Sequence, residues 1–115
     1  HTTDHVIVDV GSATHPIHPL LPAGTIRCWV LRPCYLALRK ATALTDRPDY
    51  VIMLDEIGRA LTATDIEAVI GTQVVATIDI HPAIARAIDA GLLAARPPQT
   101  AITALTAVIR RSEAA

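Results

Sequence analysis

The feature that most constrains the fold is an alternation of short apolar runs with helical patterns along the chain. The apolar runs are rich in β-branched residues and almost continuous, which is typical of strands buried on both faces. They lie at residues 5–10, 25–32, 50–56 and 72–80. The helical patterns lie at residues 35–45, 62–71, 81–93 and 97–115. This order predicts an α/β fold with a mostly parallel sheet and flanking helices.

Capping residues mark the ends of two predicted helices. Thr62 or Thr64 can cap the start of the second helix, and Gly71 can end it. Pro82 suits the first position of the third helix, which Gly91 either ends or bends.

The last helical pattern, residues 97–115, is amphipathic. It places Ile102, Leu105 and Ile109 on one face, where they can pack against a core.

The length of 115 residues predicts one domain, residues 1–115, and 51% of the residues are hydrophobic. The net charge of −1 gives no indication of nucleic-acid binding. No apolar run approaches the roughly 20 residues that span a bilayer. Cys28 and Cys34 stand on either side of a proline, and no signal peptide is apparent. We therefore expect free thiols and a cytoplasmic location.

Polar residues follow three of the predicted strands. Asp9 ends the first apolar run, Asp55 and Glu56 end the third, and Asp79 and His81 end the fourth. The carboxyl ends of parallel strands face the crevice where ligands of open α/β sheets bind. Asp9 can hold a magnesium-bound water there, or it can simply cap a turn. Glu56 is better explained as the polar end of a strand.

Two other groups of side chains offer weaker candidate sites. His15 and His18 have a spacing that could hold a metal ion, with Cys28 or Cys34 as further ligands, although each histidine precedes a proline in an irregular loop. Ser12 and His15 could form a nucleophilic pair, but no nucleophile elbow surrounds Ser12. Exposed loop histidines are the simpler interpretation.

Four segments, taken in order, resemble the carboxyl-terminal half of the MinD/ParA family of deviant-Walker P-loop ATPases, including its CpaE-like branch. "DHVIVDVGSATHP" resembles the Walker B strand and switch II, and "PLLPAGTIRCWVLRPCYLALRKATAL" resembles the next strand and helix. "YVIMLDEIGRALTATDIEAVIG" is similar to the strand, base loop and helix that follow. "TQVVATIDIHPAIARAIDAGLL" is similar to the motif "v.g.iP.dp.v.rA.d.G.l", with Pro82, Arg86, Ala87, Asp89 and Gly91 in place.

The resemblance implies a P-loop NTPase-like fold and a nucleotide-switch ATPase that acts in partitioning, septum or pilus positioning. It implies ATP and Mg²⁺ as cofactors, with the magnesium shell and switch II supplied by Asp9, Gly11 and Ser12. It places the nucleotide base beside Asp55, Asp79, Ile80, His81 and Pro82. It also implies dimerisation around ATP, together with protein partners.

The chain departs from the family in three places. The glycine-rich phosphate loop with its two lysines is absent, so no triphosphate can be cradled by this chain alone. Asp55 replaces the asparagine that meets the base, and Ile78 or Asp79 replaces the proline of the "iP.d" loop.

The missing phosphate-loop strand leaves two of the predicted strands without a neighbour. In the family that strand lies between the segments that correspond to residues 5–10 and 25–32, which are therefore left unpaired or forced together, with exposed edges. The opening residues "HTTDH" fall where the Walker B strand would start, as in a cut or processed chain. We expect half of a nucleotide site, completed by an amino-terminal half or by a second copy. The alternatives are an interaction module without ATP turnover and a metal-dependent hydrolase that uses the loop histidines.

Overall fold

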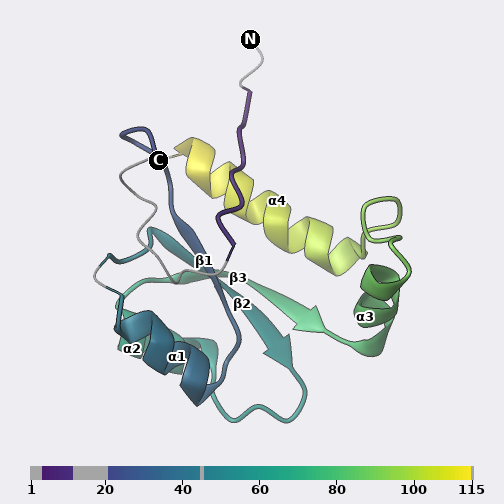
Figure 1. Ribbon diagram of the computed structural model, residues 1–115, viewed down its shortest axis with the longest axis horizontal. Coiled ribbons are helices and arrows are strands. Elements are labelled where there is room, and N and C mark those ends of the chain that lie inside the picture. The colour runs from purple at the N-terminus through teal and green to yellow at the C-terminus, as the bar shows by residue number, and fades with distance from the viewer. Residues whose placement is uncertain (1–3, 12–20, 45, 115) are drawn as a thin grey trace.

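The computed structural model describes residues 4–11, 21–44 and 46–114 (Figure 1). Strands and helices alternate as far as β3, and two helices follow it. The elements are β1 (Cys28–Leu31), α1 (Tyr35–Thr42), β2 (Tyr50–Glu56), α2 (Ala63–Ile70), β3 (Val74–Ile80), α3 (Pro82–Asp89) and α4 (Gln99–Ala114).

The three strands form one parallel sheet in the order β1-β2-β3. Leu31 pairs with Met53 at the end of β1, and Asp55 pairs with Asp79 at the ends of β2 and β3. The pairing of β2 with β3 shifts register between Val51 and Ile52. The predicted class is confirmed at this level: a small α/β fold with a parallel sheet and flanking helices.

One face of the sheet carries the main hydrophobic core, under α1 and α2. Aliphatic side chains of both helices pack there against the odd-numbered residues of β2, and Trp29, in β1, packs against the same cluster. Val51 and Ile66 are fully buried within it. The buried members are Leu38, Ala41, Val51, Met53, Ile66 and Ile70.

The opposite face is covered by α4, which lies along β3 (Figure 1). No described residue of α4 is buried. Ile102, Leu105 and Ile109 are 37–43% exposed, so the face that was expected to pack against a core does not do so. The half-buried positions of the helix include Ala101, Ala104 and Val108 instead. Arg111 anchors the end of the helix, since its guanidinium lies 5.7 Å from the ring centre of Tyr50 and donates a hydrogen bond to the Gln73 side chain.

The predicted helix ends are largely confirmed. Thr62, rather than Thr64, caps α2, and its hydroxyl and the Asp65 carboxylate each accept a hydrogen bond from the other's backbone N–H, forming a capping box. Gly71 ends α2 with φ of +78°, a conformation that glycine adopts without strain. Pro82 occupies the first turn of α3.

The prediction of a strand at residues 5–10 is wrong. Residues 4–11 form no helix or strand, and Val6 and Ile7 are 87% and 82% exposed. A strand needs a neighbour that supplies hydrogen-bond partners, and the outer edge of β1 does not take up this segment. Instead His5 Nε2 lies 2.8 Å from Glu113 Oε1, and this contact connects the segment to α4.

Candidate functional site

The carboxyl edge of the sheet brings together several of the predicted site residues. Because the strands are parallel, all three end at this edge. Asp55 and Asp79 lie at the same edge, as the sequence predicts, and they are direct register partners, so the two residues are neighbours on adjacent strands. Val51 and Met53 pack under α1 and α2, and side chains alternate along a strand, so Asp55 lies on that same face of the sheet.

Asp9 does not end a strand in this structure. Its Oδ1 accepts a hydrogen bond of 2.9 Å from the Gly11 N–H, and both residues are exposed. This is the turn-capping arrangement that the sequence left open as an alternative for Asp9. Ser12, together with His15 and His18, lies outside the described residues.

The junction of β3 and α3 carries the other predicted base contacts. Ile80 ends β3, and His81 is the N-cap residue of α3, followed by Pro82. The His81 side chain makes no capping hydrogen bond and is exposed, as is Asp79. An exposed imidazole and an exposed carboxylate therefore stand at the end of β3, where a ligand can reach both.

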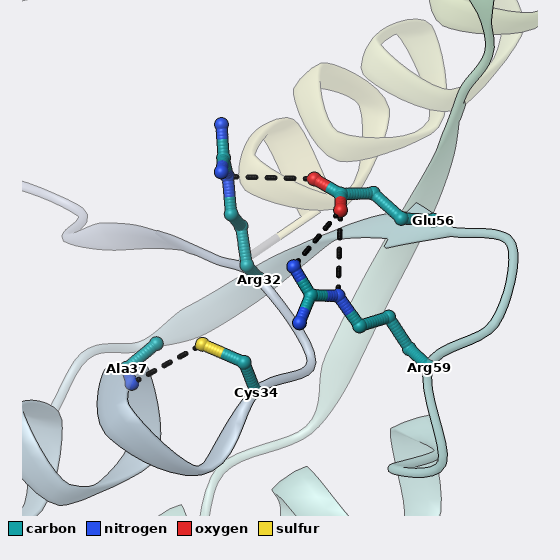
Figure 2. Close-up of polar contacts among 5 residues, drawn as sticks. All are labelled: Arg32, Cys34, Ala37, Glu56 and Arg59. Atoms are coloured by element: carbon teal, nitrogen blue, oxygen red, sulfur yellow. Dashed lines mark hydrogen bonds and ion pairs between the residues drawn. The ribbon is translucent and has the colours of Figure 1, made fainter.

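A cluster of three charged residues, Arg32, Glu56 and Arg59, occupies the carboxyl ends of β1 and β2 (Figure 2). Arg32 Nε lies 3.6 Å from Glu56 Oε1. Arg59 approaches the other oxygen, with Nη2 at 3.0 Å and Nε at 3.3 Å from Oε2. Glu56 thus holds two guanidinium groups, and it does more than end a strand.

The backbone explains why these three residues meet. Arg32 follows β1 directly, and the pairing of β1 with β2 brings it level with the end of β2. Gly58, with φ of +88°, lets the chain turn so that the Arg59 N–H donates to the Glu56 carbonyl at 3.3 Å. Sequence reasoning missed both arginines. The three-residue spacing of Glu56 and Arg59 around a glycine could have predicted their ion pair from the sequence. The contact of Arg32 with Glu56 could not be predicted in this way, because it depends on the pairing of two strands.

Both cysteines are free thiols, as predicted. Cys34 caps α1, where its sulfur accepts a hydrogen bond from the Ala37 N–H at 3.4 Å (Figure 2). Cys28, expected inside a buried strand, is exposed because β1 is an edge strand. Partial desolvation, and then the charge of Asp49, raise the pKa of the Cys28 thiol, so it stays protonated at neutral pH.

Within residues 4–11, 21–44 and 46–114, no three His, Cys, Asp or Glu side chains are grouped as metal ligands would be. In the same part of the chain, none of the helices combines the length and the apolar character needed to cross a membrane.

The fold and its edge define a small parallel α/β unit whose strand ends gather carboxylates, two arginines and a histidine. Comparison of the chain with protein-family models, with curated proteins and with solved structures gave no match.

Proposed function

We propose that this chain is the carboxyl-terminal half of a MinD/ParA-like nucleotide-switch ATPase. The observation that carries the proposal is that, within residues 4–11, 21–44 and 46–114, β1 pairs with β2 and with no second strand on its outer edge. In the family that the chain resembles, the phosphate-loop strand stands between the Walker B strand and the strand that corresponds to β1. Residues 4–11, which resemble the Walker B segment, are not paired with β1, so no segment that the structure describes takes the place of that strand.

The exposed apolar surface beside β1 supports the same proposal. Val30 is 57% exposed and Ile26 is 37% exposed, and the unpaired segment adds Val8 at 59%. An inserted strand would cover such residues and bond the free backbone groups of β1. Covering even roughly 400 Å² of apolar surface contributes about 10 kcal/mol before the costs of association.

The residues present can contact the base of a nucleotide but cannot hold its triphosphate. The exposed end of β3 and the neighbouring Asp55 offer a carboxylate that can accept from an adenine amino group. Asp9 can support a magnesium-bound water only if its segment becomes a strand. The chain has no glycine-rich loop with lysines, so the triphosphate must be held by another segment. In this proposal the chain binds and orients the base, and the complementary half supplies the phosphate cradle.

A comparison of two preparations tests the proposal: the 115-residue chain and the product of its complete reading frame. The chain alone is expected to show no ATP hydrolysis above background and to bind ATP no more tightly than about 1 mM. The complete product is expected to bind ATP·Mg²⁺ at micromolar concentration, about tenfold more weakly in Asp55→Ala. Asp89→Ala, at the exposed end of α3, removes the same charge and is the control.

Two results would contradict the proposal. One is turnover by the chain alone that disappears in Asp9→Ala, since that shows a complete site. The other is a complete product with a phosphate loop that fails to bind ATP.

An interaction module without ATP turnover is the second candidate function. Tyr35 and Ile57 follow the carboxyl edge of the sheet and are 77% and 97% exposed, and large exposed apolar side chains are typical of protein-binding surfaces. The same titration separates the two candidates, because this one predicts no ATP binding by either preparation.

A further inference from the structure

We propose that Arg32 and Arg59 form a binding site for a phosphate group, in which Glu56 is an internal anion that the phosphate displaces. The proposal rests on the proposed function only for the class of ligand, a phosphate-bearing small molecule. It assigns to this half a phosphate contact that lies outside any phosphate loop.

The convergence of two guanidinium groups on one carboxylate is the geometric basis of the site. Arg32 comes from the end of β1 and Arg59 from the turn after β2, yet they approach the two different oxygens of Glu56, at 3.6 Å and 3.0 Å (Figure 2). A phosphate presents several oxygens in a similar volume and carries more charge. It can therefore accept hydrogen bonds from both planar guanidinium groups at once, the geometry in which arginine binds phosphate best.

The cluster has hydrogen-bond donors without an acceptor among the described residues and a net positive charge. Two cations share one anion, which leaves a net charge of +1 on these three side chains. Arg32 makes an ion pair at a distance too long for a hydrogen bond, and its guanidinium donates no hydrogen bond to any part of the chain that the structure describes. The Arg32 side chain is 64% exposed and that of Arg59 is 39% exposed, so a dissolved anion reaches both.

The nearby carboxylates do not share the face of this cluster. Asp55 lies on the face that α1 and α2 cover, and alternation puts its neighbour Glu56 on the opposite face. Asp79, the register partner of Asp55, shares the first face. The two faces of one edge therefore differ in charge.

Inorganic pyrophosphate is a suitable probe, titrated into the 115-residue chain at low salt while the arginine Nε–H and backbone amide signals are followed by NMR. We expect saturable binding in the millimolar range, with shifts at Arg32, Arg59 and the turn at residues 56–60. Arg32→Gln and Arg59→Gln are each expected to weaken binding about tenfold. Arg39→Gln, which removes an exposed arginine from the last turn of α1, is expected to leave it unchanged.

Glu56→Gln separates an internal competitor from a purely structural carboxylate. If Glu56 competes with the phosphate, the substitution tightens pyrophosphate binding severalfold, whereas a merely structural role predicts that binding weakens. Equal shifts in the wild type and in the double variant Arg32→Gln/Arg59→Gln, or weaker binding in Glu56→Gln, would overturn the proposal. ATP turnover plays no part in this titration, so its outcome is independent of the two-preparation test of the proposed function.

Discussion

The packing of α2 on the sheet makes a quantitative prediction at Ile66. This side chain is fully buried and contacts the core cluster shared by α1, α2 and β2. Ile66→Ala removes three carbon atoms from that cluster while leaving the capping box at Thr62 and the end of α2 at Gly71 in place.

The expected loss follows from the burial. Removing three buried methyl or methylene groups costs about 2.4 kcal/mol at roughly 0.8 kcal/mol each. A cavity left open in part adds about 1 kcal/mol, so we expect the free energy of unfolding to fall by about 3 kcal/mol. The whole stability of a domain is roughly 5–15 kcal/mol, so the variant should remain folded but unfold at clearly lower denaturant.

Urea unfolding followed by tryptophan fluorescence measures this loss, because the single tryptophan, Trp29, packs against the same core. Val69→Ala is the matched control, since Val69 lies on the same helix and is 50% exposed. We expect it to change stability by less than about 0.5 kcal/mol, as the better helix propensity of alanine offsets the small loss of burial. A loss in Ile66→Ala below about 1 kcal/mol, or one equal to that of the control, would refute the described packing of α2.

Three further predictions concern acid stability, metal ions and assembly. Hydrogen bonds from the Thr62 backbone and hydroxyl lower the pKa of Asp65. The contribution of Asp65 to stability is therefore present above the ordinary carboxyl pKa and is lost as the pH falls through the lowered value. Urea midpoints at pH 3 and pH 6 should differ less in Asp65→Asn than in the wild type. The melting temperature should be the same with a chelator and with added zinc. A shift of several degrees that His15→Ala abolishes would favour the alternative of a metal-dependent hydrolase. Sedimentation at micromolar concentration should show a dimer or larger assembly, reduced by Val30→Lys, because a lysine on an edge strand discourages pairing; a stable monomer over a dilution series would contradict the reasoning from missing neighbours.

The central part of the fold could be predicted from sequence because local signals there agree with the packing. Residues 50–56 were expected as a strand and form β2 with the same limits, since this strand is paired on both sides and buried. The second helix begins at its threonine cap and ends at Gly71, and both ends are determined by residues within the same ten-residue segment. The strand expected at 25–32 forms only as Cys28–Leu31, because β1 pairs with one neighbour, β2, in the part of the chain that the structure describes.

Features that depend on distant neighbours could not be predicted in the same way. The pattern of residues 5–10 is typical of a strand, but no described strand pairs with this segment, and its valines are exposed. The placement of Asp55 and Asp79 at the same edge of the sheet was predicted because both end parallel strands, whereas their direct register pairing is known from the structure. The cluster around Glu56 was not, because Arg32 reaches it only through the pairing of β1 with β2.

Amide hydrogen exchange at β1 tests the central claim most directly, namely that β1 is an interior strand of a larger nucleotide-binding sheet. The measurement compares peptides covering residues 4–11 and 26–31 in the 115-residue chain and in the product of the complete reading frame, with and without ATP·Mg²⁺. We predict fast exchange at residues 4–11 and at the outward amides of β1 in the chain, and protection of both in the larger product as the inserted strand pairs with them. Exchange at the same rate in both preparations would contradict the claim.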